Sequence, residues 1–425
     1  MTLADPLTPL LSRVTNAEST RLAAIAAMRL TTMAVKFALT IYIARRMGLA
    51  DLGLYGLVSS VVIVGPIVAA MGLMGLLARE LVTRTLDELT QLLVHYWRVV
   101  GAIYAVVLFP VALGIGLYFG QPAICLITLG IWLFEHANND GFAVLISRHR
   151  PLLANTLYFL RAGAWMLAFM AAALVAPPSW AMTLLLSVWF TFELIAFIGF
   201  AVVVRGWPWS SASASWRETA RWWQQTAVPA LKFWASDTGN LLGLYVDRYI
   251  ITAMLGLEYL GVYVLFWSVA NAVYNLTETG TLQTRRPRLI EAHHRGDTAA
   301  YRQVFRSMSA SSLGSSVVLS LAAGALFPLA LQFINRPLAD SFVPLLWVLL
   351  LAGVARVGFG LLTNDLYARR RDIAMVTTSI LLLPVSAILS LVLLPIWGLY
   401  GAAWAGVVAL VLLTVSRIVA IKREA

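Results

Sequence analysis

The sequence has little cysteine, little lysine and few charged residues of any kind. A single cysteine, Cys125, excludes an internal disulfide and a metal site built from several cysteines. The three lysines, Lys36, Lys232 and Lys422, lie outside any glycine-rich phosphate-binding loop, so we do not expect this chain to hydrolyse ATP. Neither a nucleophile elbow nor a zinc-protease motif occurs, and the first residues do not have the basic and apolar segments of a secretory signal.

Charged residues make up 12% of the chain, hydrophobic residues make up 60%, and the mean hydropathy is +0.82. Soluble domains are about 45–50% apolar and about 25% charged, so this composition predicts a membrane-embedded protein. The formal net charge of +11 would also suit a nucleic-acid-binding protein. Most basic residues, however, stand in short segments between apolar runs, which indicates membrane topology and no nucleic-acid partner.

Twelve apolar runs are long enough to cross a hydrocarbon core, which needs about 20 residues per helix. Their approximate ranges are 24–44, 53–76, 95–118, 123–144, 152–175, 180–204, 230–253, 259–281, 308–333, 341–365, 373–394 and 398–419. Segments on the side of the termini hold twenty-one lysines and arginines, Arg417 among them, whereas the opposite loops hold only Arg45, Arg46 and Arg336. The positive-inside rule therefore predicts that both termini are cytoplasmic.

Two eight-residue stretches repeat at an offset of 208 positions. Residues 48–55 read GLADLGLY and residues 256–263 read GLEYLGVY, and each stretch follows the first crossing of its half. Because each half has an even number of crossings, the two copies have the same orientation in the membrane. We therefore predict an all-α integral membrane fold of twelve transmembrane helices, arranged as two parallel-repeat six-helix lobes around a central cavity.

The segment between the halves divides the chain into predicted domains. We expect an N-lobe over residues 1–204, a cytoplasmic linker with an interfacial helix over 205–226, and a C-lobe over 227–425. Tryptophans beside arginines in the middle segment indicate a helix that lies on the membrane surface. A second polar segment, residues 283–306, is predicted to be a cytoplasmic amphipathic helix.

Charged side chains inside apolar crossings are costly, so they usually face a cavity or a partner. Arg29 and Lys36 are seven residues apart, which places them on one face of the first crossing, and that crossing contains no acidic residue. This pattern favours a water-filled cavity. The offset of 208 places Arg29 at the position of Asp237, so these two side chains are candidates for pairing across the halves in one conformation.

Four further charged residues form two candidate pairs. Glu193 and Arg161 would neutralise each other within the first half. Asp247 and Arg248 would form a structural pair in the seventh crossing. A role in transport is the alternative for both pairs, and the sequence leaves it open.

The remaining ionisable residues of the crossings also allow two interpretations. His136 and Asp140, with Glu135 adjacent, fit a buried histidine whose partners are satisfied, which we favour, or a proton relay. They supply too few ligands for a metal site. Lys232 and Asp365 are expected to lie near the membrane boundary and to extend into water.

Two stretches resemble a known family. Residues 43–81 (IARRMGLADLGLYGLVSSVVIVGPIVAAMGLMGLLAREL) are similar to the opening of bacterial polysaccharide flippases, where an arginine ends the first helix and a Gly-x-Tyr turn follows. Residues 245–266 (YVDRYIITAMLGLEYLGVYVLF) resemble the start of the second half of that family, where Asp-Arg and Gly-x-Tyr recur. The family belongs to the multidrug/oligosaccharidyl-lipid/polysaccharide exporter (MOP) superfamily.

The resemblance implies a flippase and not an enzyme. By alternating access, it would move an undecaprenyl-pyrophosphate-linked oligosaccharide from the cytoplasmic to the periplasmic leaflet of the bacterial inner membrane, for O-antigen, capsule or exopolysaccharide synthesis. No cofactor is implied, and an ion gradient or consumption of the product would drive transport. The implied partners are the lipid-linked oligosaccharide, membrane lipids, a polysaccharide polymerase and glycosyltransferases. Lipid II flippases of the same superfamily carry two further helices that this sequence does not have.

The candidate site residues follow from these arguments. Cationic side chains would hold the phosphates by charge-assisted hydrogen bonds, and aromatic residues such as Trp132, Tyr245 and Trp267 would stack on sugar rings. The substrate-binding candidates are Arg29, Lys36, Arg356 and Arg161. The gating or coupling candidates are Asp237, Glu193, Glu135, Arg45, Asp247 and Arg248.

Two other functions stay open from the sequence. An ion-coupled small-molecule or drug antiporter of the same superfamily would favour an acidic, cation-attracting cavity, whereas the charged groups here are mostly basic. A membrane-embedded glycan-modifying enzyme would generally need a catalytic loop outside the bilayer, and the outer loops predicted here are short.

Overall fold

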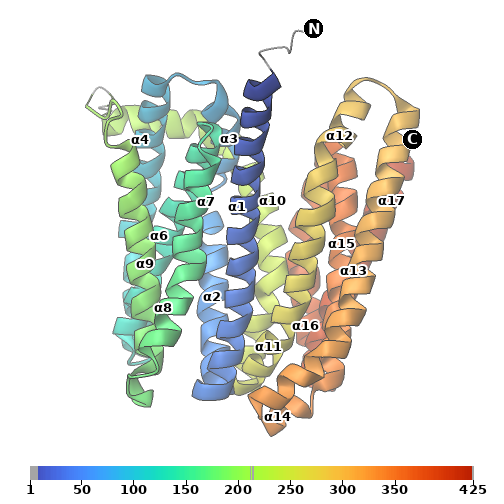
Figure 1. Cartoon of the computed structure of the whole chain (residues 1–425). Helices are drawn as coiled ribbons and strands as arrows, with labels where there is room; N and C mark the ends of the chain where they lie inside the picture. The colour runs from blue at the N-terminus through green and yellow to red at the C-terminus, as the bar shows by residue number, and fades with distance from the viewer. Residues whose placement is uncertain (1–7, 211, 213–214, 424–425) are drawn as a thin grey trace. The chain divides into compact units, whose positions relative to one another are not determined.

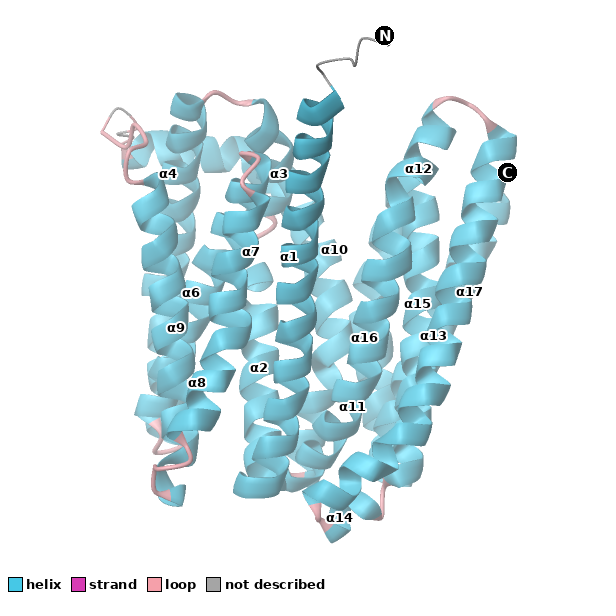
Figure 2. Ribbon diagram, in the orientation of Figure 1, coloured by secondary structure: helices cyan, strands magenta, loops and turns pink. Residues whose placement is uncertain are grey.

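Figure 1 shows the computed structural model of the chain, which describes residues 8–210, 212 and 215–423. The regular structure of these residues is helical, and none of them forms a strand (Figure 2). Ten helical stretches in this described part are long and apolar enough to cross a membrane. Two more long helices, α6 (Pro122–Ser147) and α10 (Trp216–Leu255), carry several polar residues in their interiors. The prediction of an all-α multi-pass membrane protein is confirmed.

The helices pack into two compact units. The first unit contains the described residues up to Leu39 and Leu77–Trp223, and the second contains Thr40–Leu76 and the residues from Gln224 onward. The first unit holds most of α1 (Thr8–Tyr42), with α4 (Leu86–Ile103), α5 (Phe109–Tyr118), α6, α7 (Pro151–Phe159), α8 (Trp165–Ala172) and α9 (Ala181–Val204). The second unit holds α2 (Leu49–Ala69), most of α10, α11 (Leu257–Thr277), α12 (Gln283–His294), α13 (Thr298–Ile334), α14 (Pro337–Asp340), α15 (Val343–Ala368), α16 (Asp372–Trp397) and α17 (Leu399–Arg423). The short helix α3 (Leu73–Thr83) spans the second boundary between them.

Helix α2 packs with the second unit because it lies along α11. The domain boundaries predicted at residues 204 and 227 separate the two halves of the sequence repeat and not the two packed units. These predicted boundaries stay a prediction.

The repeated octets pack directly against each other, at the starts of α2 and α11. A Cβ atom on Gly53 would overlap the carbonyl oxygen of Leu257, and a Cβ atom on Gly261 would overlap the carbonyl oxygen of Leu49. These two contacts are related by the 208-residue offset, as in an interface with two-fold symmetry. Contacts advance in the same direction along both helices, so the helices are parallel. Only glycine allows the two backbones to approach this closely.

Each octet begins with a glycine that ends one helix and starts the next. Gly48 has a φ of 123° and Gly256 a φ of 90°, a region of backbone space that favours glycine. Both glycines are the N-caps of their helices, α2 and α11. The octet is therefore a sharp turn followed by a close-packed first helical turn, present once in each half.

Arg336, just before α14, holds the end of the first helix. That helix finishes in the π-turn η1 (Ile43–Met47), whose last carbonyls lack partners within the helix. Arg336 Nε donates to the Ala44 carbonyl at 3.0 Å, and its Nη2 donates to the Arg45 carbonyl at 3.1 Å. A side chain from the second half of the sequence thus caps a helix from the first half.

Helix bounds differ from the sequence prediction at several turns. The predicted crossing at 53–76 ends earlier, because Met71 and Gly72 adopt φ values of 47° and 72° and break the chain into α2 and α3. The predicted polar helix over 283–306 is divided at Gly296 into α12 and the start of α13, which run side by side (Figure 1). The surface helix that begins at Trp216 continues into the next crossing as the single helix α10, with Pro229 inside it.

Candidate functional site

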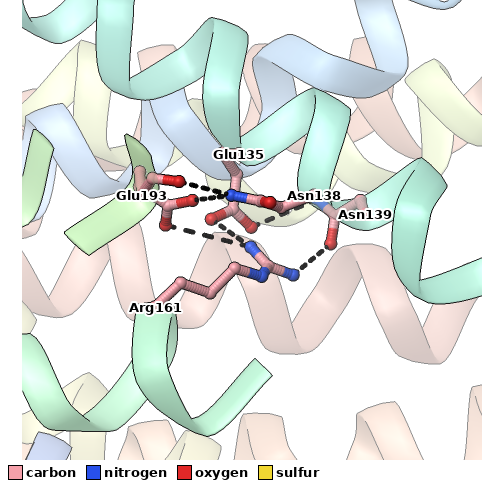
Figure 3. A network of polar contacts seen from close by, with 5 residues as sticks. All are labelled: Glu135, Asn138, Asn139, Arg161 and Glu193. Carbon is pink, nitrogen blue, oxygen red and sulfur yellow. Dashed lines mark hydrogen bonds and ion pairs between the residues drawn. The ribbon is translucent and has the colours of Figure 1, made fainter. Parts of the chain in front are cut away.

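A buried network of charged and amide side chains lies in the first unit (Figure 3). Arg161 Nη1 lies 2.5 Å from Glu135 Oε2 and 3.9 Å from Glu193 Oε1. Arg161 Nη2 donates to Asn139 Oδ1 at 2.6 Å, and Asn138 Nδ2 donates to Glu193 Oε2 at 2.8 Å. The predicted neutralisation of Arg161 within the first half is confirmed, with Glu135 as the nearer partner and Glu193 as the more distant one.

Local helix geometry brings this network together. Arg161 lies in the π-turn η3 (Leu160–Ala164), which joins α7 to α8, and a π-turn inserts an extra residue that rotates the following side chains. The guanidinium is 3% exposed and Glu193 is 0% exposed, so both are removed from water. The network has two carboxyl groups for one guanidinium, and Glu193 Oε1 makes no hydrogen bond with the described residues. This arrangement can hold one proton without losing its ion pair.

His136, which directly follows Glu135 in α6, is a buried histidine with satisfied partners, as favoured from the sequence. Its Nε2 lies 2.8 Å from the Tyr96 hydroxyl and its Nδ1 lies 3.2 Å from the Tyr104 hydroxyl. Asp140 lies one turn further along α6, 3.7 Å from the imidazole. No group of three potential metal ligands forms anywhere in the described part of the chain.

Asp247 and Arg248, predicted as a structural pair, have separate partners. The Tyr263 hydroxyl donates to Asp247, and the Arg248 backbone N–H donates to Asp247 Oδ1 at 2.8 Å. The Arg248 guanidinium instead lies over two rings, with its Cζ 4.1 Å from the Tyr245 centroid and 4.0 Å from the Trp267 centroid. Two of the rings suggested for sugar stacking therefore pack on a buried cation by cation–π contact.

The second unit contains a polar cavity of about 310 Å³. It is bounded by α10, α11, the π-turn η5 (Glu278–Leu282), α12 and α15. Its charged lining residues are Arg356, Arg286 and Glu278, and its uncharged polar lining residues include Asn240, Tyr274, Gln283, Thr363 and Asn364. Two guanidinium groups against one carboxylate make the cavity basic, in a bundle whose other surfaces are mostly apolar.

The cavity arginines are held in place by neutral groups. Arg356 Nη1 donates to Asn271 Oδ1 at 3.1 Å, and its Cζ lies 3.8 Å from the centroid of the Tyr274 ring. Arg286 lies over the Tyr367 ring at 4.5 Å. Because these partners orient the guanidinium groups without neutralising them, both groups keep the capacity to bind an anion.

The other candidate residues are exposed side chains on α1 and α10. Arg29 Nε donates to Asn155 Oδ1 at 3.1 Å, and Lys36 is exposed on the same helix. Asp237 is exposed on α10. The pairing of Arg29 with Asp237 stays a prediction. Arg45 is exposed at the end of the first helix, where its carbonyl accepts the bond from Arg336.

Two residues assigned to the membrane boundary from the sequence are buried instead. Asp365 is 2% exposed, accepts a hydrogen bond from the Tyr301 hydroxyl and pairs with Arg369 Nε at 3.1 Å, so the expectation that it extends into water was wrong. Lys232 is exposed on α10, and its position at the membrane boundary stays a prediction. Arg417, counted among the loop arginines, is 0% exposed within α17. Its position inside the last apolar run was the signal that sequence reasoning passed over.

Several solved structures of membrane transporters share this fold. The inward-closed structure of the lipid II flippase MurJ superimposes with a TM-score of 0.76 and 9% identity, covering 94% of this chain and 87% of that one. A multidrug resistance MATE-family transporter of the MOP superfamily in an inward-facing conformation gives 0.70 and 13% identity, covering 92% of this chain and 95% of that one. An outward-facing transporter of the same MATE family gives 0.60 and 12% identity, covering 93% of each chain.

Comparisons at the level of sequence gave no match, either to a protein-family model or to a curated protein. At identities of 9–13%, the structural neighbours establish the fold alone. These neighbours are multidrug transporters and a lipid II flippase. The chain therefore has the all-helical fold of the MOP-superfamily transporters.

Proposed function

We propose that the protein is a flippase for undecaprenyl-pyrophosphate-linked oligosaccharides. The observation that carries the proposal is the basic, amide-lined cavity around Arg356, inside a bundle of apolar membrane-spanning helices. A pyrophosphate–sugar head group cannot enter hydrocarbon, because each polar group left without a partner costs about 2–7 kcal/mol. Arginines and amides in the fold of a transporter offer such a head group a polar route, while the lipid tail stays in the bilayer.

The charge of the cavity favours this substrate over a cationic drug. Arg356 and Arg286 outnumber Glu278, and the candidates on the first helix, Arg29 and Lys36, are also cationic. Cations attract phosphate oxygens through charge-assisted hydrogen bonds and repel cationic drugs. The fold is similar to that of a lipid II flippase and to that of multidrug transporters, so the fold alone is compatible with a lipid-linked or a drug substrate. The basic charge of the cavity favours the lipid-linked substrate.

The proposed cycle is alternating access coupled to a proton gradient. The buried network supplies a place for the proton on Glu193, whose Oε1 lies 3.9 Å from Arg161 without a hydrogen bond. Protonation there would remove the excess negative charge of the network and change how α6, α9 and the η3 turn pack. We expect Glu193→Gln to retain binding of the lipid-linked sugar but to lose any response of transport to an imposed pH gradient. An undiminished response would remove Glu193 from the coupling step.

The proposal also assigns a location and partners. The protein would lie in the bacterial inner membrane with both termini in the cytoplasm, because the positive charges gather on that side of the predicted crossings. It would receive its substrate from glycosyltransferases and deliver it to a polysaccharide polymerase for O-antigen, capsule or exopolysaccharide synthesis.

The decisive experiment is translocation by the purified full chain in liposomes. A fluorescent undecaprenyl-pyrophosphate oligosaccharide would be placed in one leaflet, and its arrival in the other would be followed by a non-permeant quencher. We expect Arg356→Gln to slow translocation about 10- to 100-fold, since hydrogen bonds to charged groups contribute about 1.5–3 kcal/mol. Arg302→Gln, which removes an exposed arginine of α13, is the matched control. Efflux of a cationic dye without any translocation of the lipid would favour the drug antiporter instead.

A further inference from the structure

A fully buried arginine lies behind the wall of the cavity in the second unit. Arg417 on α17 donates through Nε to Thr378 Oγ1 at 2.8 Å and through Nη2 to Ser379 Oγ at 3.3 Å. Its Nη1 donates to the Phe359 carbonyl at 2.9 Å and to Thr363 Oγ1 at 2.5 Å. The guanidinium carbon lies 3.5 Å from the centroid of the Phe359 ring. Every one of these partners is neutral.

A buried guanidinium with neutral partners keeps its full positive charge. Hydroxyl and carbonyl groups satisfy its N–H donors, but they do not cancel its field at a distance as a carboxylate would. Burial of such an ion is expensive, so charged groups at membrane depth usually serve a substrate or ion. The low dielectric around Arg417 allows its field to reach further than it would in water.

The partners of Arg417 are also walls of the cavity. Phe359 and Thr363 both line it. On α15, Arg356, Gly360 and Thr363 are spaced at i, i+4 and i+7, which places them along one helical face, and all three line the cavity. The charge of Arg417 therefore acts on the same open space that Arg356 lines, with Thr363 between Arg417 and that space.

We propose that this cavity binds a phosphate or pyrophosphate group. Arg356 and Arg286 would contact the phosphate oxygens, the amides of Asn240 and Asn364 would donate further hydrogen bonds, and Arg417 would act as a positioning residue that raises the positive potential through Thr363. Guanidinium groups suit this role because they match phosphate geometry with two parallel N–H donors.

The size and charge of the cavity set the class of ligand. A volume of about 310 Å³ lies at the lower end of small-molecule sites, so the cavity admits a small anionic group but not a whole oligosaccharide. Glu278, the carboxylate in the lining, opposes an anion and lowers its affinity. The group is carried either by a lipid-linked head group or by free pyrophosphate, and the choice of the lipid rests on the proposed function.

The test measures binding to the purified full chain in nanodiscs by calorimetry. One arm adds inorganic pyrophosphate. The second arm uses nanodiscs that contain undecaprenyl pyrophosphate, with undecaprenol as the control lipid without phosphate, and displaces the lipid with inorganic pyrophosphate. Binding in both arms with competition between them identifies a lipid-linked group, and binding of inorganic pyrophosphate without competition identifies a free one.

The variants separate a role in the site from a role in folding. We expect Arg356→Gln to weaken pyrophosphate binding at least about tenfold and Arg417→Met about tenfold. Arg417→Met removes the desolvation cost of a buried charge but leaves its hydroxyl and carbonyl partners without that donor, so we expect the variant to fold with at most a modest loss of melting temperature while it loses affinity. Arg417→Lys keeps the charge and should retain most of the affinity. Glu278→Gln should bind pyrophosphate more tightly than the unchanged chain, and Arg302→Gln should match it.

Several outcomes would overturn the assignment. Unchanged affinity in Arg417→Met would show that Arg417 does not act on the cavity, and a loss of melting temperature without a loss of affinity would give it a purely structural role. If Arg417→Met does not fold, Arg417→Lys and Glu278→Gln decide the matter, because unchanged or weaker pyrophosphate binding in Glu278→Gln would show that the anion does not bind beside Glu278 in this cavity. Absence of pyrophosphate binding in both arms would remove the site altogether.

The failure of this inference is distinguishable from the failure of the proposed function. Pyrophosphate binding that depends on Arg417, without translocation of lipid-linked sugar, would keep the anion site and refute the flippase. Translocation that is unaffected by Arg417→Met and Arg356→Gln would keep the flippase and refute this site.

Discussion

Removing the guanidinium of Arg161 should strongly destabilise the first unit. Arg161→Met leaves the fully buried Glu193 and the 20% exposed Glu135 without their shared cation. At the observed 3.9 Å, the Arg161–Glu193 attraction alone is about 4 kcal/mol for an effective dielectric constant near 20, before the opposing cost of desolvation. Breaking a buried ion pair by removing one partner typically costs about 3–5 kcal/mol, so we expect a loss of that size.

A double-mutant cycle isolates the interaction. Glu135→Gln would be combined with Arg161→Met, and the melting temperature of each purified variant in the same detergent would be compared with that of the unchanged chain. We expect the double variant to be clearly more stable than the single Arg161→Met variant, because one buried charge is removed with its partner. A double variant whose loss equals the sum of the two single losses would mean that the pair does not interact, and would refute this account of the network.

Three other predictions concern the packing of the second unit. Gly53→Ala should lower the stability by about 3 kcal/mol or prevent folding, because its Cβ atom would overlap a backbone carbonyl of α11. In a thermal unfolding experiment, the control Gly358→Ala should be neutral or stabilising, because its Cβ atom meets nothing within 4 Å. Arg336→Gln should lower stability by about 1–3 kcal/mol, since two carbonyls at the end of the first helix lose charged donors, and hydrogen exchange should rise selectively at that turn. Asp365→Asn should cost about 1–3 kcal/mol by removing a buried ion pair, while the exposed Lys232→Gln should change the melting temperature little; equal effects would argue against the burial of Asp365.

The fold was largely predictable because a membrane-spanning helix needs a long apolar segment, which a hydropathy analysis of the sequence detects. A run of about 20 apolar residues has few alternatives to a spanning helix, since every backbone polar group must be satisfied within it. The sequence placed the turns less well. Met71 adopts a left-handed conformation that non-glycine residues seldom take, so the break between α2 and α3 gave little sequence signal. The continuity of α10 through Pro229 was likewise missed, because proline usually ends a helix.

The candidate site was only partly predictable, because the sequence reveals charged residues but not their partners. Arg161 could be assigned to a pair with Glu193 from the order of the crossings. Its closer contact with Glu135 depends on the π-turn η3, which rotates the side chain and has no distinct sequence signature. Helical spacing could not show that Asp247 and Arg248 have separate partners, because Tyr263, which binds the aspartate, and Trp267, which packs on the arginine, lie on the neighbouring helix α11.

Arg417 shows that a count of loop charges can include an arginine that is in fact buried within a helix. An arginine near the end of a crossing usually extends its guanidinium to the membrane interface. For this reason it is counted with the loop charges when the positive-inside rule is applied. Here the acceptors that retain it, Thr378, Ser379 and Thr363, lie on two other helices that only the folded chain brings together. Sequence alone therefore assigned to the membrane surface a charge that the structure places in the interior.

The mutual fit of the two octets has a consequence for how the halves of this chain can change. Each glycine accommodates a carbonyl from the other copy, so a larger residue in either copy is a defect for both. A substitution at this contact in one octet would therefore need a simultaneous adjustment 208 positions away, so the two octets can change only together.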